Sequence, residues 1–363
     1  MLVAATTVKD TVAHLERYVR GNLAGGLDHL VVFLDAPGAP GQAEARAFLE
    51  KQEQVTCVPA GRGWWGEGRP AELNRRQCTN ANLVKHLLAQ AGCTGPEDWI
   101  FHIDGDEVVR LDRAVLAGLP PERTAVQLAV REVVSRERWD AVPDLFKREL
   151  TGAELDRLRT RGLIAEADNR AYFHGHLQGK AGARPGAPVW LTLHRAVSES
   201  GAVVEGLSHP DLEVFHFESY SGEEFVRKWT AILDSGPRVA HRPGRAEFAR
   251  EIAAVVRSTE PEDVRRGRFM ELYRAHIEDD VAALTEAGVL LQVDVTQPVA
   301  SPAAVDGSVI TALRDSIEAM RGRPKDEFFH GASTKNGRVL GAGVDPKRGG
   351  RVRSALRRGR SGR

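Results

Sequence analysis

The chain has 363 residues, of which 42% are hydrophobic and 28% are charged, and its 50 basic side chains balance its 50 acidic ones. This composition is that of a globular protein, and the length suffices for one large α/β domain with an appendage or for two domains. The zero net charge excludes a global field that would attract nucleic acid or a membrane surface.

Cysteine use and the N-terminal sequence bear on location. Three cysteines without a CxxC pair argue against a disulfide framework and favour a reducing cytoplasm. The start MLVAATTVKD lacks the basic and apolar regions of a signal peptide. No apolar run approaches the roughly 20 residues needed to span a bilayer. We therefore expect a cytoplasmic protein.

The first hundred residues alternate between strand and helix patterns. Continuous apolar runs predict strands, and apolar residues three or four apart predict the helices between them. Three such β-α units before a fourth strand favour a parallel sheet with right-handed crossovers. The expected strands are 2–8, 29–35, 55–60 and 98–104, and the expected helices are 11–26, 41–52 and 71–92.

The middle of the chain is mixed. Strands are predicted over 124–134, 189–196 and 212–219, with a helix or loop over 151–167 and a turn region rich in His and Gly over 172–186. Ser221 and Glu224 form a capping-box pattern that predicts a helix start. A polar helical pattern follows from 246 to about 287. We expect a catalytic domain over 1–235, a mainly helical appendage over 236–330 and a flexible basic tail over 331–363.

Three carboxylates, on Asp104, Asp106 and Glu107, follow the fourth predicted strand directly. Ligands bind at the carboxyl ends of parallel strands, so Asp35 after the second strand should face the same rim. Clustered carboxylates repel one another unless a divalent cation neutralises them. A D-x-D sequence at this position therefore indicates a site for Mg²⁺ or Mn²⁺ with a diphosphate, the alternative being a solvated acidic turn.

Two enzyme families place D-x-D after an apolar strand. The sequence IFHIDGDEV resembles the first motif of haloacid-dehalogenase-type phosphatases, which implies Asp104 as a nucleophile. In that family the motif normally lies on the first strand, whereas three β-α units precede it here.

The second resemblance covers about residues 2–229. The opening strand, helix and acid-ended strand, then RRQCTNANLVKHLLAQ before DWIFHIDGDEVV, resemble the family 2-like glycosyltransferases of the GT-A fold. GHLQGKAGARPG, LTLHRA and VFHFESYSGEEFVRKW are similar to segments of a bacterial branch related to the family 92 type. The resemblance implies a GT-A-like (Rossmann-like) α/β fold, with a mostly parallel sheet and flanking helices.

The resemblance also implies roles for matching residues. Asp104 and Asp106 would hold Mn²⁺ or Mg²⁺ on the diphosphate of a UDP- or GDP-type sugar donor, and His216, with His194 as second choice, would complete the ion's ligands. Lys180 and Arg184 would approach phosphate and help the leaving group depart. The residues expected at the nucleotide-sugar are Lys9, Asp35, Arg76, Gln77, Asn80, Asp104, Lys180 and Arg184.

Several of these assignments have a structural alternative. Arg76, Gln77 and Asn80 would equally suit a solvated helix face, and the segment from Lys180 to Arg184 a surface loop. His174 and His176 form an H-x-H pair, but without partner cysteines or HExxH we do not expect zinc. The tryptophans Trp64, Trp65 and Trp139 suit either sugar stacking or ordinary packing.

The family 2 resemblance implies inversion at the anomeric carbon, which needs a general base for the acceptor hydroxyl. Glu107, Glu132, Asp140 and Glu218 are the candidates, and Asp140 lies where acceptor-side loops usually fall. The expected catalytic residues are Asp106, Glu107, Asp140 and Lys180.

We therefore expect a glycosyltransferase that moves a sugar from a metal-bound nucleotide diphosphate-sugar to a glycan or other hydroxyl acceptor, without nucleic acid as a partner. A phosphatase and a non-catalytic nucleotide-sugar-binding or glycan-binding protein on the same scaffold are the alternatives. The tail from Lys347 to Arg363 carries only basic charges. It either touches anionic lipid at the inner membrane face or has no specific role.

Overall fold

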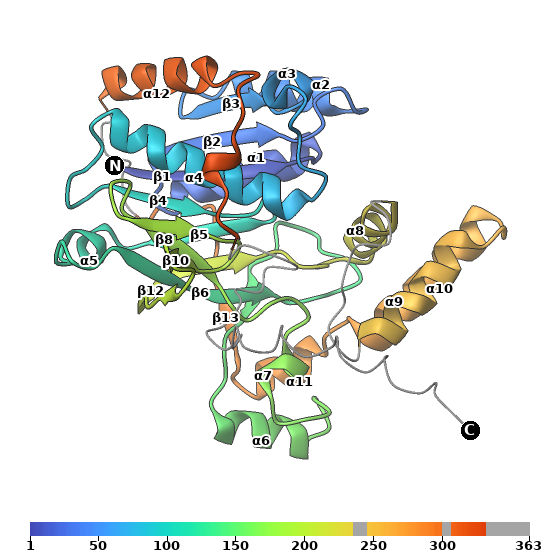
Figure 1. The fold of residues 1–363 in the computed structure, drawn as a ribbon. Helices are drawn as coiled ribbons and strands as arrows, with labels where there is room; N and C mark the ends of the chain where they lie inside the picture. The colour runs from blue at the N-terminus through green and yellow to red at the C-terminus, as the bar shows by residue number, and fades with distance from the viewer. Residues whose placement is uncertain (235–244, 300–305, 332–363) are drawn as a thin grey trace, which may run out of the picture.

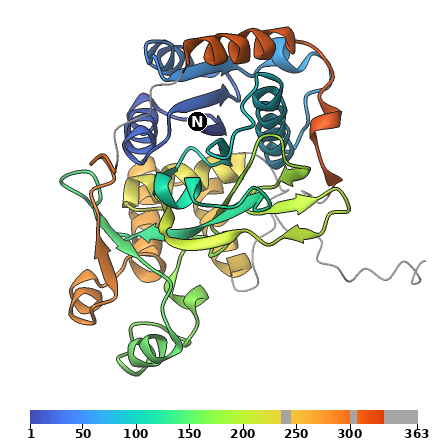
Figure 2. The ribbon, with the colours of Figure 1, turned by 90° about the vertical axis from the view of Figure 1, so that its left-hand side faces the viewer.

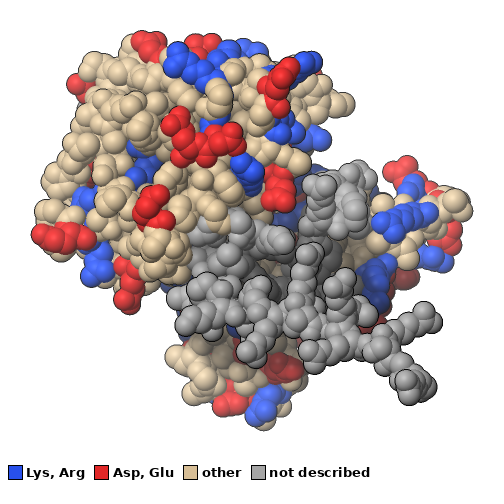
Figure 3. All heavy atoms as spheres, in the orientation of Figure 1, with Lys and Arg blue, Asp and Glu red and all other residues tan. Residues whose placement is uncertain are grey.

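The computed structural model describes residues 1–234, 245–299 and 306–331 and shows an α/β fold built on one large sheet (Figure 1). The sheet has ten strands, and a separate sheet has three. Apart from Gly331, the expected basic tail lies outside the described residues. On the face shown in Figure 3, basic and acidic side chains are interspersed. In the described part of the chain, no helix is both long and apolar enough to cross a membrane.

The first half of the sheet is parallel, in the order β3-β2-β1-β4, as the sequence predicts. Its strands are β1 (Leu2–Val8), β2 (His29–Leu34), β3 (Val55–Pro59) and β4 (Trp99–His102). The helices between them are α1 (Val12–Ala24), α2 (Gln42–Glu50), the short α3 (Arg62–Trp65) and α4 (Leu73–Gln90).

Alternation along β1 explains why helices cover both faces of this half. Leu2 and Ala4 join the hydrophobic cluster that includes α1 and α2, whereas Val3 and Ala5 join the cluster that includes α4. Successive side chains of a strand point to opposite faces, so a strand buried on both faces has no polar side. Figure 2 shows α1 and α4 on opposite sides of these strands.

The second half of the sheet is mixed. Strand β8 runs antiparallel between β4 and β6, and β12 pairs with β6 in parallel and with β5 antiparallel. The strands are β5 (Glu107–Leu111), β6 (Ala125–Val133), β7 (Leu145–Lys147), β8 (Lys180–Ala183), β12 (Leu207–His216) and β13 (Leu290–Gln292). Helices α5 (Arg113–Ala117), α6 (Gly152–Thr160) and α7 (Asn169–Tyr172) connect them.

Two predictions for the segment 172–196 were wrong. The expected turn contains β8, and the ring of Phe101 occupies the space where a side chain at Gly182 would lie. A Cβ on that glycine would lie 2.4 Å from the Phe101 ring. The expected strand 189–196 is split between β9 (Val189–Leu191) and β10 (Ala196–Ser198), which form the small sheet with β11 (Val203–Val204).

The described residues after 221 are mostly helical. Helices α8 (Gly222–Asp234), α9 (Arg245–Arg257) and α10 (Glu262–His276) share their own hydrophobic cluster, with Phe225 and Tyr273 among its members. After α11 (Val281–Glu286), however, β13 joins the main sheet by pairing with β7. Helix α12 (Gly307–Ala319) packs in the cluster that contains α4, and the 3-10 turn η1 (Asp326–Phe328) follows it. The segment expected as an appendage thus also completes the main domain.

Candidate metal centre

The acidic motif lies at the carboxyl edge of the parallel strands, as expected. β4 ends at His102, and the chain turns through Asp104 and Asp106 into β5. A Cβ on Gly105 would lie 2.5 Å from a methyl of Val8, so only glycine lets this turn rest against the end of β1. Asp35 follows β2 at the same edge of the sheet.

Three buried polar residues form a row across neighbouring strands at this edge. His216, the last residue of β12, is the register partner of Glu107 in β5 and of Glu132 in β6. Side chains at paired positions point to the same face of a sheet. The three residues are 4%, 1% and 0% exposed. The sheet therefore places an imidazole between two carboxylates in a dry environment.

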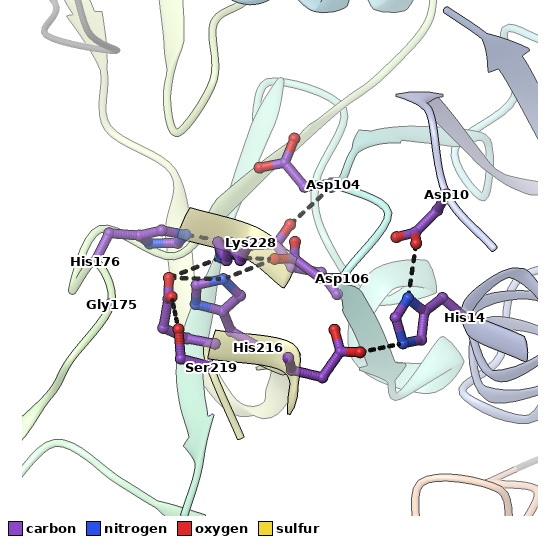
Figure 4. A network of polar contacts seen from close by, with 12 residues as sticks. Asp10, His14, Asp104, Asp106, Gly175, His176, His216, Ser219 and Lys228 are labelled. Carbon is purple, nitrogen blue, oxygen red and sulfur yellow. Dashed lines mark hydrogen bonds and ion pairs between the residues drawn. The ribbon is translucent and has the colours of Figure 1, made fainter. Parts of the chain in front are cut away.

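The turn from His174 to His176 covers this row. The backbone N–H groups of His174 and Gly175 donate to the Glu132 carboxylate, the first at 2.7 Å. The imidazoles of His176 and His216 stack with centroids 4.8 Å apart, and Figure 4 shows them beside each other. A Cβ on Gly175 would lie 2.9 Å from the His216 ring, so glycine is required for this close approach.

Glu107, His176 and His216 each offer a ligand atom, and these atoms all lie within 4.8 Å of one another. The Nδ1 atoms of both histidines are buried and have no hydrogen-bond partner among the described residues. Asp106 is adjacent, with its Oδ2 3.5 Å from Nε2 of His216. Buried, unpaired nitrogens are costly unless a ligand satisfies them, so these residues fit a metal ion.

The expected metal set of Asp104, Asp106 and His216 is only partly brought together. Asp104 instead accepts a hydrogen bond from Gln77 at 2.7 Å and pairs with the ammonium of Lys180. Lys180 is fully buried and also lies 3.3 Å from the Glu107 carboxylate. Burial lowers the pKa of Lys180, but Asp104 and Glu107 raise it more, so the ammonium stays charged. The positive charge of Lys180 thus compensates part of the negative charge of the acidic turn.

The charge of Lys180 acts on the pKa of Glu107. Burial raises the pKa of Glu107, but the charge of Lys180 and the hydrogen bond from His176 hold it well below its usual range. The distance from Nε2 of His176 to the carboxylate is 3.2 Å. Glu107 is therefore an ionised carboxylate, which is the form that binds a cation.

Helix α8 brings a second lysine to the site. The Lys228 ammonium lies 3.0 Å from Asp106 and 2.9 Å from Glu218. Burial raises the pKa of Asp106, but Lys228 and His216 lower it more, to well below its usual range. Burial lowers the pKa of His216, but Asp106 outweighs it and the pKa is raised to about 9. Cationic side chains thus neutralise the carboxylates in this structure.

A buried ion cluster holds the His174–His176 turn in place. The Lys147 ammonium lies 3.0 Å from Glu132 and 3.1 Å from Asp279, and both Lys147 and Glu132 are fully buried. Asp279 also lies 3.3 Å from Nε2 of His174. The H-x-H pair of His174 and His176 was not expected to bind a metal, and Lys147, Asp279 and Lys228 were not expected near the site. A lysine within the apolar run DLFK was a usable signal for Lys147, whereas nothing local marked Asp279.

The residues expected near the nucleotide base or sugar are engaged with one another. Asp35 and Arg76 form a bidentate ion pair with both contacts at 2.6 Å. Asn80 is 1% exposed, donates to Thr7 and accepts from Trp64. Of the three helix residues expected to face the donor, only Gln77 reaches the acidic turn.

Arg184 does not join Lys180. Lys180 begins β8 and Arg184 directly follows its last residue, so their Cα atoms are roughly 13 Å apart along the extended chain. The Arg184 guanidinium donates to the backbone carbonyl oxygens of Arg123, Pro96 and Leu119 and stacks over Trp99. The expectation that both approach one phosphate was therefore wrong, because β8 separates them.

The remaining expected residues lie at the surface or in the core. Lys9 and Asp140 are exposed, and no contact joins either to the metal centre within the described residues. His194 lies beside His176, with ring centroids 4.3 Å apart. Trp64 and Trp65 are buried in a hydrophobic cluster, so the packing alternative is confirmed for that pair.

Neither a family model nor a curated protein matches this sequence.

Proposed function

We propose that this protein transfers a sugar from a metal-bound nucleotide diphosphate-sugar to an acceptor hydroxyl, with inversion. The observation that carries the proposal is the convergence of Asp106, Glu107, His176 and His216 at the carboxyl edge of the parallel strands. Open α/β sheets bind their ligands at this edge. A solvated acidic turn would not require two carboxylates and two imidazoles to meet in this way.

The mixture of carboxylate and imidazole ligands favours Mn²⁺ over Mg²⁺. Mg²⁺ prefers oxygen ligands, whereas imidazole nitrogens suit the first-row transition ions. Glu107, His176 and His216 would hold the ion, with Asp106 beside them. When bound, the ion would neutralise negative charge on the donor's diphosphate.

The two lysines have different roles in this proposal. Lys180 is fully buried against Asp104 and Glu107, so it is a positioning residue that keeps the acidic turn ionised. The side chain of Lys228 is 27% exposed at the same edge. Its ammonium can pair with a phosphate oxygen of the donor as readily as with Asp106.

The general base must have a pKa suited to taking a proton. Glu107 is poorly suited, because Lys180 and His176 depress its pKa and make it a weak base. Asp140 is exposed in the loop between β6 and β7. It stays our candidate for the group that deprotonates the acceptor.

The experiment is thermal unfolding of the full chain with UDP or GDP, each with and without Mn²⁺. We expect one nucleotide to raise the melting temperature only when Mn²⁺ is present, and Asp106→Asn to remove that shift. Donor hydrolysis or transfer should depend on the same aspartate. Hydrolysis of p-nitrophenyl phosphate with trapping by beryllofluoride would instead favour the phosphatase, with Asp104 as nucleophile. A nucleotide shift without donor turnover would favour the binding protein.

A further inference from the structure

A cavity separate from the metal centre lies beside the start of helix α8. Its volume is about 710 Å³, within the range of small-molecule sites. Its lining comes from the start of α1, residues 137–139 and 141–143 of the loop after β6, the start of α8 with Tyr220 and Ser221, and α10. Nothing in the proposed donor site uses these residues.

The uncompensated charge in this cavity is positive. Two of its carboxylates are already paired, Glu137 with Arg274 at 2.7 Å and Glu223 with Arg266 at 3.0 Å. Arg17 and Arg138 also line the cavity. Among the described residues, neither has a carboxylate within ion-pair distance, which leaves their charges available to a ligand.

Arg17 is held ready for such a ligand. Its guanidinium donates to the Tyr220 hydroxyl at 2.9 Å and lies over the rings of Phe217 and Tyr220, 4.4 and 5.0 Å from their centroids. One hydrogen bond uses one of its five N–H donors. The aromatic rings fix its plane, so it is preorganised for the bidentate binding of a carboxylate or phosphate.

Aromatic side chains form another wall of the cavity. The indole N–H of Trp139 donates to the backbone oxygen of Tyr220 at 3.0 Å, which fixes the two residues together. Arg136 lies over the Trp139 ring, 4.9 Å from its centroid. Aromatic side chains beside arginines without carboxylate partners suit a ligand with an apolar face and an acidic group, as in an acidic sugar.

The backbone joins this cavity to the metal centre. The Phe217 N–H donates to the Asp106 carbonyl at 2.9 Å, and Tyr220 follows three residues later. His216 and Tyr220 are four residues apart, so their Cα atoms are at most about 14 Å apart. A ligand bound in the cavity therefore lies close to the edge where the donor is expected.

We propose that this cavity binds the acceptor and that the acceptor carries an acidic group, a carboxylate or a phosphate, on or next to a sugar. That the bound molecule is an acceptor rests on the proposed transfer reaction. The anion site itself rests on Arg17, Arg138 and the aromatic wall alone.

The test is calorimetric titration of the full chain with methyl β-D-glucuronide, glucose 1-phosphate and the neutral methyl β-D-glucoside. We expect at least one acidic probe to bind ten times more tightly than the glucoside, and the better one identifies the acid as carboxylate or phosphate. The double variant Arg17→Gln/Arg138→Gln should lose that tenfold advantage and still bind the glucoside as before. Arg20→Gln, an exposed arginine on the same helix as Arg17, is the matched control and should change nothing.

Other outcomes are equally decisive. The assignment is overturned if acidic and neutral probes bind with equal affinity, or if the double variant binds the acidic probe as tightly as the wild type does. If the double variant does not fold, Arg138→Glu serves instead. Arg138 is exposed, so the fold should tolerate the change. The affinity for the acidic probe should fall at least threefold. A Mn²⁺-dependent nucleotide shift without acidic-probe binding overturns the cavity assignment alone. Acidic-probe binding without that shift supports the anion site and overturns the transfer reaction.

Discussion

Glu107 of β5 and His216 of β12 are direct partners in an antiparallel ladder, and both are almost completely buried. Neighbouring strands thus set the separation of the carboxylate and the imidazole, rather than a flexible loop. The His174–His176 turn then adds His176 from above. A metal ion bound by these residues would meet a preorganised site, because the proposed ligands come from rigid elements and are fixed by a second layer of hydrogen bonds.

Gly175→Ala should weaken Mn²⁺ binding about tenfold, as for other changes beside metal ligands. The added methyl would lie 2.7 Å from Glu132 and 2.9 Å from the His216 ring, so the imidazole must shift. Titration with Mn²⁺ measures the effect. Gly38→Ala, where an added methyl meets no atom within 4 Å, is the control. Unchanged affinity in Gly175→Ala would show that His216 does not hold the ion.

Lys228→Met should strengthen Mn²⁺ binding roughly fivefold. The Lys228 ammonium lies 3.0 Å from Asp106 and competes with a metal ion for it. At this separation the competition amounts to about 1 kcal/mol even in water. Lys51→Met, an exposed lysine at the end of α2, is the control. Weaker Mn²⁺ binding in Lys228→Met would mean that the lysine supports the ion site rather than opposing the ion.

Lys147→Met should lower the free energy of unfolding by about 3–5 kcal/mol, because it leaves buried carboxylates without their counter-ion. Both Lys147 and Glu132 are fully buried at a separation of 3.0 Å. Urea denaturation measures the loss. Adding Glu132→Gln should recover part of it by removing the stranded charge. A loss below about 1 kcal/mol would contradict the ion cluster as described.

His14 should stabilise the fold at low pH. Its imidazole lies between Asp10 at 2.7 Å and Glu224 at 3.1 Å. Figure 4 shows the contact with Asp10. Burial lowers the pKa of His14, but the two carboxylates raise it more, so it is raised above 6.5 in the folded state. A group with a raised pKa contributes stability that is present below its unfolded value and is lost as pH rises through its folded value.

The measurement compares the free energy of unfolding of the wild type and His14→Gln. The difference between them should be larger at pH 6 than at pH 9. His86→Gln, at an exposed position on α4, should show no such dependence. A difference that grows with pH would contradict the raised pKa.

Local patterns predicted the first half of the fold. Each strand from β1 to β4 is a short apolar run, and each helix between them has a helical period, so the carboxyl edge with Asp104 and Asp106 followed from the sequence. β8 could not be predicted in this way. Its sequence KAGA has low strand propensity, and it is a strand because it pairs with β4 on one side and β6 on the other. At Gly182 the Phe101 ring leaves no room for a side chain.

The site was predictable at the D-x-D motif and at His216 but not in its pairings. Asp35 and Arg76 are far apart in the sequence, so nothing local showed that they bind each other rather than a ligand. Glu107 was expected in the acidic turn, yet it begins β5, and that strand brings it beside His216. His176 becomes a neighbour of both only when β6 and β12 pair.

The central claim is that Glu107, His176 and His216 hold a divalent ion. Direct titration of the metal-free protein with Mn²⁺, followed by electron paramagnetic resonance, tests it most directly. We predict one bound ion per wild-type chain, affinity lowered at least 100-fold in Glu107→Gln and in His216→Gln, and no change in the exposed control Glu122→Gln. Wild-type protein that binds no Mn²⁺, or folded Glu107→Gln and His216→Gln variants that bind it as tightly as the wild type, would contradict the account.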